Sequence, residues 1–292
     1  MKDSGVVSSA AEPVSLSPGG PIGVLDSGLG GLSILRALRQ ELPDESFIYV
    51  ADQAHLPFGP RPLAEIRAFV QAITRFLLDN DTKTIVVACN AASAASLLYL
   101  RERFPAVPFI GMEPAVKPAA AATRSGVIGV LTTAATAEGP LYARVIERYA
   151  RHLRVATIVC PELVQAIENG QTDLDSLRPL FDRKLPPLQE AGADQLALAC
   201  THFPFAAQAI RAYLGPGVTV IDPSPAIARQ TRRVLAQHGL FYAGHQPAMV
   251  RYLTTGDPVR FAAVAGSLLS ESISAEKLRW SEGVLVQAKS CR

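Results

Sequence analysis

The chain has 292 residues, of which 49% are apolar and 18% are charged, and its formal net charge is +2. This composition is typical of a soluble globular protein, and no block of Lys and Arg marks a nucleic-acid-binding surface. No apolar run approaches the roughly 20 residues that cross a bilayer, and the N-terminal stretch lacks the apolar region of a signal peptide. The four cysteines form no CxxC motif, which favours free thiols in a reducing compartment. The sequence therefore predicts a cytoplasmic protein that binds neither nucleic acid nor membranes.

Short apolar segments alternate with helix-like segments along most of the chain, as is typical of parallel sheets covered by helices. Strands are expected at 21–25, 46–51, 85–88, 108–112, 126–131, 155–159, 195–200, 218–221 and 248–254, the last at a sheet edge. Helices are expected at 32–42, 63–78, 137–150, 161–168, 224–237 and 257–268, and others begin after residues 90, 114 and 203. Residues 173–191 are also helical in pattern but are interrupted by Pro186 and Pro187. The residues after 268 are ambiguous.

Two pairs of segments repeat along the chain at nearly the same offset. The sequence IGVLDS at Ile22–Ser27 resembles IGVLTT at Ile128–Thr133, 106 residues later. Cys89 and Cys200 each follow an apolar strand, precede a helix-like stretch, and lie 111 residues apart. We therefore predict two related α/β halves, each with a cysteine at the carboxyl edge of its sheet, where open α/β folds bind ligands.

A glycine-rich turn, Gly28–Gly31, follows the first strand, and Asp52 ends the next one. This pattern superficially resembles a dinucleotide site, but the spacing is GxGG rather than GxGxxG, and Asp26 would repel a pyrophosphate. The alternative interpretations are a tight turn before a helix, or a turn whose amides bind a small carboxylate while Asp26 faces a cation. We favour the second of these.

Either cysteine alone could be a buried core residue. Together they fit a different interpretation, because a helix N-terminus favours a thiolate and two halves could present two thiols to opposite sides of one bound carbon. A zinc site formed by Cys89, Cys200 and His202 is a rival, although no fourth ligand with familiar spacing is evident. A single cysteine acting as an acyl-transfer nucleophile is another, and it leaves the second thiol unexplained.

The remaining candidates carry less signal. Cys160 is interpreted as a structural residue, and Glu168 as a solvated charge at a helix end, which Asn169 and Gly170 terminate as a C-cap. No constellation is evident around the other histidines, His55, His152, His238 and His245.

Several ordered motifs resemble those of the glutamate racemase family, the cofactor-independent enzymes within the aspartate/glutamate racemase group. The resemblance covers residues 21–268 and rests on GVLDSGLGG at 23–31, Asp52 with PFG at 57–59, ACN at 88–90, GVLTT at 129–133, residues 160–168, ACTH at 199–202 and TTGDP at 254–258. It implies an α/β protein with two Rossmann-like domains, built on parallel sheets and related by pseudo-twofold symmetry, and an active site between them.

The resemblance also implies a domain organisation in which the C-terminal segment completes the first domain. We expect a disordered N-terminal tail at 1–19, whose Ser, Gly, Pro and Ala content already suggests disorder. The first α/β domain is then 20–112 plus 223–280, the second is 113–222, and 281–292 is a C-terminal tail. Family members are often dimers, and a homodimer is expected.

The implied reaction interconverts L- and D-glutamate by proton transfer at Cα, without pyridoxal phosphate, another cofactor or a metal, and supplies D-glutamate for peptidoglycan. Inversion of a stereocentre requires removal of a proton from one face and delivery of a proton to the other. By resemblance, the catalytic residues are Cys89, which deprotonates the D-isomer, Cys200, which deprotonates the L-isomer, and the assisting Asp26 and His202.

The resemblance assigns the remaining site positions residue by residue. Asp26 and Ser27 lie at the ammonium end of the substrate, and Asn90 and Thr201 contact the α-carboxylate region. The side-chain carboxylate is expected near the Phe58–Gly59 backbone and Thr133, and Ala91 and His202 are further substrate-binding positions. Asp26, Asp52, Glu168 and His202 match positions with supporting acid/base or electrostatic roles.

Two residues depart from the family pattern, in which tyrosine stands at Phe58 and threonine at Ala91. The missing hydroxyl at Ala91 removes a substrate hydrogen bond worth about 1.5–3 kcal/mol. The alternatives are therefore racemization of aspartate or of another small acidic substrate, a related racemase or decarboxylase, or a non-catalytic binding protein of the same fold, such as a gyrase modulator.

Overall fold

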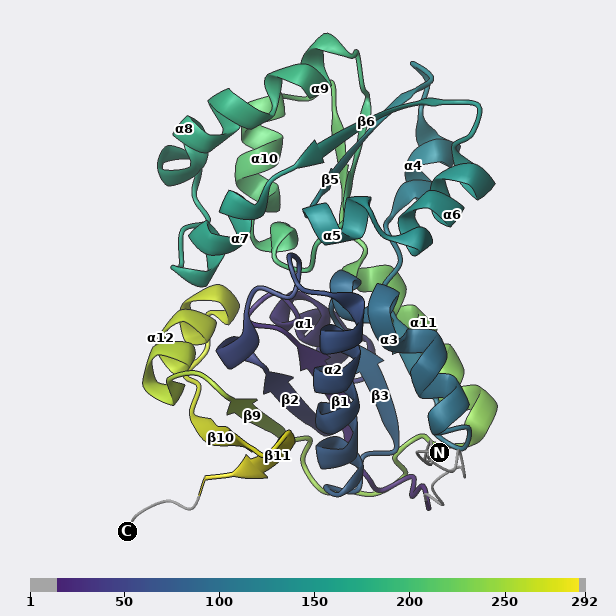
Figure 1. The fold of residues 1–292 in the computed structure, drawn as a ribbon, viewed down its shortest axis with the longest axis vertical. Helices are drawn as coiled ribbons and strands as arrows, with labels where there is room; N and C mark the ends of the chain where they lie inside the picture. The colour runs from purple at the N-terminus through teal and green to yellow at the C-terminus, as the bar shows by residue number, and fades with distance from the viewer. Residues whose placement is uncertain (1–14, 289–292) are drawn as a thin grey trace, which may run out of the picture.

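The computed structural model describes residues 15–288, and its strands form two sheets (Figure 1). The larger sheet contains β1 (Ile22–Asp26), β2 (Phe47–Ala51), β3 (Thr84–Val87), β4 (Phe109–Gly111), β9 (Val250–Thr254), β10 (Ala275–Ser281) and β11 (Val284–Gln287), in the order β11-β10-β9-β2-β1-β3-β4. The smaller sheet contains β5 (Val127–Thr132), β6 (Arg154–Val159), β7 (Gln195–Leu198) and β8 (Thr219–Ile221), in the order β6-β5-β7-β8.

The two sheets repeat one topology. The order β2-β1-β3-β4 in the first matches β6-β5-β7-β8 in the second, and all of these neighbours pair in parallel. β1 therefore corresponds to β5 and β3 to β7, which accounts for the two offsets in the sequence. The prediction of an α/β protein with two parallel-sheet cores is confirmed, and among residues 15–288 only β10 and β11 pair antiparallel.

Helices cover both faces of the larger sheet. α1 (Leu32–Glu41), α11 (Ser224–His238) and α12 (Pro258–Leu269) pack on one face, and α2 (Leu63–Leu78) and α3 (Asn90–Arg103) pack on the other. Successive residues of a strand point to opposite faces, so that Val24 lies in the first core and Leu25 in the second. Burial on both faces explains why these strands are apolar runs rather than alternating ones.

The smaller sheet is covered in the same way by two groups of helices. Its helices are α4 (Val116–Ala122), α5 (Ala134–Ala137), α6 (Pro140–Tyr149), α7 (Pro161–Glu168), α8 (Leu174–Lys184), α9 (Pro186–Glu190) and α10 (Ala207–Leu214). Two 3₁₀ turns complete the fold, η1 (Gln53–His55) and η2 (Phe203–Ala206). No helix within residues 15–288 combines the length and apolar character needed to span a bilayer.

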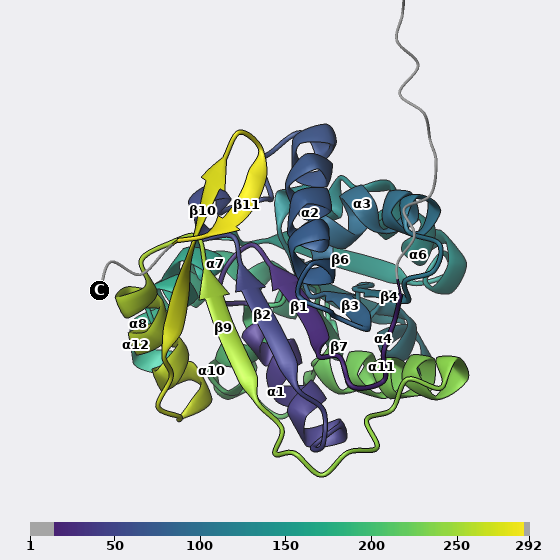
Figure 2. The same cartoon turned by 90° about the horizontal axis from the view of Figure 1, so that it is seen from below.

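Three sequence predictions need correction. The segment 248–254 forms no edge strand, because β9 lies between β2 and β10. The helix expected at 137–150 is broken, since Gly139 takes an extended conformation and starts α6. The predicted C-terminal tail, 281–292, begins too early: β10 and β11 form a hairpin beside α2 (Figure 2), and only 289–292 lie outside the described residues.

The predicted N-terminal tail, 1–19, is also too long at its C-terminal end. Residues 1–14 lie outside the described part, but Leu16 packs against the first domain and the Pro18 carbonyl accepts a hydrogen bond from Lys83 Nζ at 2.7 Å. Lys83 is buried and also pairs with Glu45. These contacts fix residues 15–19, whose composition alone suggested disorder.

Candidate active site

A cavity of about 360 Å³ lies where the carboxyl edges of the two sheets meet. The first domain contributes Ser27, Leu56, Pro57, Phe58, Gly59, Pro60, Cys89, Asn90 and Ala91 to its wall. The second contributes Thr133, Ala134, Thr136, Pro161, Glu162, Val164, Gln165, Cys200, Thr201 and His202. Both predicted thiols therefore face one cavity, from equivalent positions of the repeated fold.

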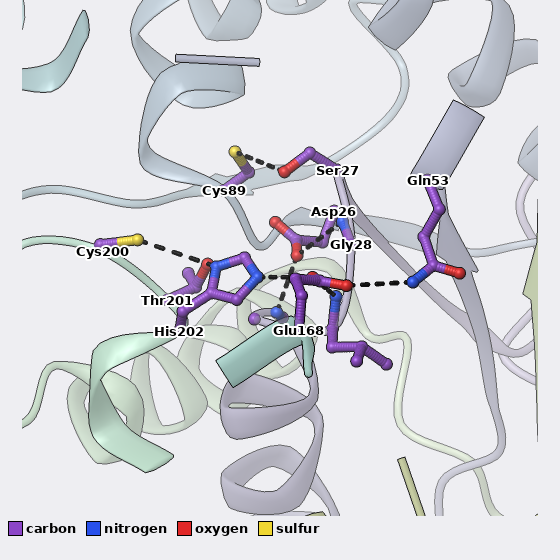
Figure 3. A network of polar contacts seen from close by, with 12 residues as sticks. Asp26, Ser27, Gly28, Gln53, Cys89, Glu168, Cys200, Thr201 and His202 are labelled. Carbon is purple, nitrogen blue, oxygen red and sulfur yellow. Dashed lines mark hydrogen bonds and ion pairs between the residues drawn. The ribbon is translucent and has the colours of Figure 1, made fainter. Parts of the chain in front are cut away.

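Cys89 forms the N-cap position of α3, directly after β3. Its sulfur lies 4.0 Å from the Ser27 hydroxyl oxygen, within the range of a hydrogen bond to sulfur (Figure 3). Burial raises the pKa of the Cys89 thiol far above its ordinary value, and the charge of Asp26 raises it further. Both effects favour the protonated thiol form of Cys89.

Cys200 follows β7 and has a different polar neighbour. Its sulfur lies 3.8 Å from Nδ1 of His202, and Nε2 of that histidine lies 2.7 Å from Oε1 of Glu168 (Figure 3). Burial by itself would lower the pKa of His202, but hydrogen bonds to Cys200 and Glu168 outweigh it and raise this pKa well above 6.5. These two partners therefore favour the protonated form of His202 beside the second thiol.

Glu168 is buried at the end of α7, which corrects its interpretation as a solvated charge. Besides His202, its carboxylate accepts hydrogen bonds from the Leu29 amide at 2.7 Å and from the Gln53 side chain at 3.0 Å. Burial opposes ionisation, but the hydrogen bond to His202 and these contacts lower the pKa of Glu168 overall. The Glu168 carboxylate thus joins α7 of the second domain to the glycine-rich turn of the first.

The glycine-rich turn binds the carboxylates of the protein itself. Oδ2 of Asp26 accepts the amides of Gly28 at 3.1 Å and Gly31 at 3.0 Å, while the Leu29 amide bonds Glu168. The hypothesis that these amides bind a substrate carboxylate is therefore wrong. A Cβ at Gly30 would overlap the His202 ring, so that only glycine permits this close approach of the two domains.

Asp26 is fully buried, and its Oδ1 has no hydrogen-bond partner within the described residues. Burial raises the pKa of this carboxyl, whereas His202 and the Gly31 and Gly28 amides oppose the shift. Asp26 does not line the cavity but lies behind Ser27 and between the two thiol sites (Figure 3).

Asn90 is a buried side chain of the cavity wall, and neither its Oδ1 nor its Nδ2 has a hydrogen-bond partner in the part of the chain that the structure describes. A buried amide without partners is costly, which indicates that a ligand satisfies it. Thr133 lies across the cavity, 3.3 Å from Thr136 between hydroxyl oxygens. Ala91 presents only a methyl group to the same space.

Asp52 is the predicted site residue that the structure keeps away from the thiols. It does not line the cavity, and its carboxylate binds His55 Nδ1 at 2.8 Å, Thr255 Oγ1 at 2.9 Å and Trp280 Nε1 at 2.8 Å. His55 therefore has partners, contrary to the sequence interpretation.

Sequence reasoning also missed Gln53 and Tyr49, whose hydroxyl donates to the Gly28 carbonyl at 2.7 Å. A buried tyrosine in a strand gives no signal of such a contact.

The zinc alternative finds no ligand set, because no group of three or more His, Cys, Asp or Glu is placed to hold a metal ion among residues 15–288. Cys160 is buried in the second core, outside the cavity, and burial raises its pKa to about 11.

Residues 22–231 match the model of the Asp/Glu/Hydantoin racemase family. The chain belongs to this family. It is 47% identical to the glutamate racemase of Ectopseudomonas mendocina, over 86% of this chain and 95% of the relative. It is 48% identical to the glutamate racemase of Deinococcus radiodurans, over 85% and 86% of the two chains.

Solved structures of glutamate racemases have the same fold as this family member. One from Bacillus anthracis superposes with a TM-score of 0.80 at 33% identity, over 91% of this chain and 98% of the other. One from Francisella tularensis, in complex with D-glutamate, gives a TM-score of 0.78 at 29% identity, over 89% and 97%.

Proposed function

We propose that the protein interconverts L- and D-glutamate by moving a proton at Cα between two thiols. The observation that carries this proposal is the pair Cys89 and Cys200, which reach one cavity from equivalent positions of two repeated domains. Racemization needs one group that removes the Cα proton and another that protonates the opposite face. Two thiols on opposite walls supply both.

The neighbours of the thiols support different starting states. We assign Cys200 as the group that accepts the proton of L-glutamate, because its sulfur lies 3.8 Å from Nδ1 of His202, a group that can take up the thiol proton. Asp26 disfavours a second anion at Cys89, which stays protonated. In this arrangement the Cys200 thiolate takes the proton of L-glutamate, and the Cys89 thiol gives its own proton to the other face of the carbanion. The reverse reaction begins from the opposite protonation state.

The carbanion intermediate needs donors around the α-carboxylate, where its charge is delocalised. The unpartnered Asn90 amide and the hydroxyl of Thr201 are the groups we assign to this role. Ser27, with Asp26 behind it, is assigned to the ammonium group, and Phe58, Gly59 and Thr133 to the side-chain carboxylate. The cavity wall position of all but Asp26 supports these assignments.

The resemblance to glutamate racemases supports three further expectations. The product D-glutamate is a peptidoglycan precursor, so we infer a role in cell-wall synthesis and cell shape. The enzyme is expected to act in the cytoplasm, where that precursor is used, and to work as a homodimer. Its substrate is a free amino acid, and neither cofactor, nucleic acid nor membrane is part of the proposed reaction.

The test is circular dichroism of the purified protein with D-glutamate, without added cofactor, and again with D-aspartate. We expect loss of optical activity with glutamate alone. Loss of optical activity with aspartate alone would show that aspartate is the substrate, and would indicate that Ala91 contributes to this preference. A constant signal with both substrates, from folded protein, would contradict the racemase proposal and favour the binding-protein alternative.

A further inference from the structure

The Leu56–Pro60 segment forms one wall of the cavity and is held from behind by a cluster of side chains outside it. This cluster, called here the ring cluster, consists of His55, Phe58, Phe69 and Trp280 around Asp52. Its members come from η1, α2, the wall segment and the C-terminal strand β10. Only Phe58 of these residues lines the cavity.

The contacts of the ring cluster are specific in geometry. The His55 ring stacks on Phe69 with centroids 3.7 Å apart and planes 10° apart, and the Trp280 ring meets the His55 ring at 66° and 5.0 Å. Phe69 also contacts the Phe58 ring, with centroids 6.0 Å apart. His55 is thus packed between two rings immediately before the wall segment begins.

Hydrogen bonds to Asp52 hold the rings of this cluster in place, in addition to the packing of the rings against one another. One carboxylate oxygen binds the His55 ring at 2.8 Å, and the other accepts the Trp280 indole at 2.8 Å and the Thr255 hydroxyl at 2.9 Å. A fully buried carboxylate without these donors would be strongly destabilising. The orientation of the His55 ring is therefore set by groups from the C-terminal part of the chain.

The same part of the chain also reaches the other side of the site. Thr254 donates to the Gln53 Oε1 at 2.9 Å, and this bond turns Gln53 Nε2 toward Glu168, at 3.0 Å. Glu168 in turn holds His202. The first and last residues of η1, Gln53 and His55, thus contact Thr254 of β9 and Trp280 of β10, respectively. Gln53 also bonds Glu168, and His55 directly precedes the wall segment.

We propose that Trp280 and His55 are positioning residues, which hold the Leu56–Pro60 wall where it binds substrate. The C-terminal hairpin β10–β11, whose sequence gave no structural signal, then takes part in substrate binding without touching the ligand. This inference rests on the proposed function in that glutamate is taken as the ligand of the cavity.

The first test compares Trp280→Leu, Trp280→Phe and His55→Phe, with Arg279→Gln as the matched control on the exposed side of the same hairpin. His55→Phe keeps a ring on Phe69 but loses the bond to Asp52. We expect KM for glutamate to rise about tenfold in Trp280→Leu and His55→Phe, less in Trp280→Phe, with kcat within about threefold, because uniform binding is lost when a wall is displaced. Arg279→Gln should leave both constants unchanged.

A purely structural role would lower the melting temperature and leave KM unchanged in every variant, which would overturn the proposal. If Trp280→Leu fails to fold, His55→Phe and Trp280→Phe still decide the question. A fall in kcat with an unchanged KM would also contradict it.

A second measurement does not depend on turnover. Trp280 is the only tryptophan of the chain, so its fluorescence reports on the ring cluster alone. We expect saturable changes in emission and in acrylamide quenching when glutamate is added to the native protein, and loss of the change in His55→Phe. Emission that is unaffected by glutamate at concentrations that saturate racemization would contradict the coupling. A saturable change in Trp280 emission in a protein that does not racemize glutamate would support the coupling of the ring cluster to the cavity and contradict the proposed reaction.

Discussion

Cys89 and Cys200 occupy the same position in two copies of one fold, but their surroundings have opposite electrostatic character. Each follows the third strand of its domain and faces the shared cavity. The first sulfur has a neutral hydroxyl beside it and the Asp26 carboxylate behind. The second has the imidazolium of His202, which Glu168 holds in place. Repetition of the fold therefore fixes where the thiols lie, and the residues around them give the two thiols different polar neighbours.

Contacts that cross between the domains join the surroundings of the two thiols. Glu168 belongs to the second domain but bonds the Leu29 amide and Gln53 of the first. The Ser33 hydroxyl of the first domain donates to the Thr201 carbonyl of the second at 2.8 Å. Each thiol has its polar neighbours within its own domain, and these contacts hold the two sets of neighbours against each other.

The largest effect is expected from removal of either thiol. Cys89→Ala and Cys200→Ala should each lower kcat/KM in both directions by about 10³-fold or more, since each variant lacks one of the two proton-transfer groups. Polarimetry measures the rate from each enantiomer. Cys160→Ala is the matched control, because this cysteine is also buried beside a strand end but outside the cavity. Full activity of Cys89→Ala would refute the two-thiol mechanism.

A smaller loss, about 10²-fold, is expected in His202→Gln, because Cys200 loses the neighbouring group that can exchange a proton with its sulfur. The equilibrium constant between enantiomers is one, so kcat/KM must fall equally in both directions. The asymmetry appears instead in isotope effects: that of L-[2-²H]glutamate should rise and that of D-[2-²H]glutamate should fall, because transfer at Cys200 becomes limiting. Ser27→Ala should lower kcat/KM about tenfold and change the isotope effects in the opposite sense, with a larger effect for D-[2-²H]glutamate and a smaller one for L-[2-²H]glutamate. The same isotope pattern in both variants would show that the thiols are not distinguished by these neighbours.

Glu168→Gln should change the pH dependence more than the maximal rate. Glu168 helps to raise the pKa of His202, so the histidine stays cationic below that raised value and loses its charge as pH rises through it. In the variant this pKa falls, and the basic limb of kcat/KM should move to lower pH. The variant should lose about tenfold or more above neutrality and less at lower pH, where a larger fraction of His202 is protonated. An unmoved basic limb would assign it to another group.

The smallest effect is expected from Ala91→Thr, which adds a hydroxyl to the cavity wall without touching either thiol. One added hydrogen bond to a carboxylate is worth about 1.5–3 kcal/mol, so KM for glutamate should fall about tenfold, while the ratio of the two kcat values stays constant. Initial rates with D- and L-glutamate and with D-aspartate measure this. If Ala91→Thr instead raises KM for glutamate and lowers KM for aspartate, Ala91 sets a substrate preference other than the one proposed.

The sequence by itself determined the alternation of strands and helices, the repeat of two α/β halves, and the placement of Cys89 and Cys200 at strand ends. These features are local: buried parallel strands require apolar runs, and the residue that follows such a run reaches the ligand edge of the sheet. The end of a helix is local as well: α7 ends at Glu168, and Gly170, two residues later, has a positive φ of 81°, in agreement with the predicted C-cap.

Only the tertiary structure decided which polar side chains meet. Glu168 and Asp52 are both acids near the ends of secondary-structure elements. Glu168 bonds His202, whereas Asp52 bonds His55 and Trp280. The amides of Gly28, Leu29 and Gly31 could have bound a ligand, but the carboxylates of Asp26 and Glu168 take them. Several of these pairings join residues far apart in the sequence, 115 positions in Gln53–Glu168 and 228 in Asp52–Trp280. They form because a buried charge is stable only with partners, and the packing of two domains determines which partners are within reach.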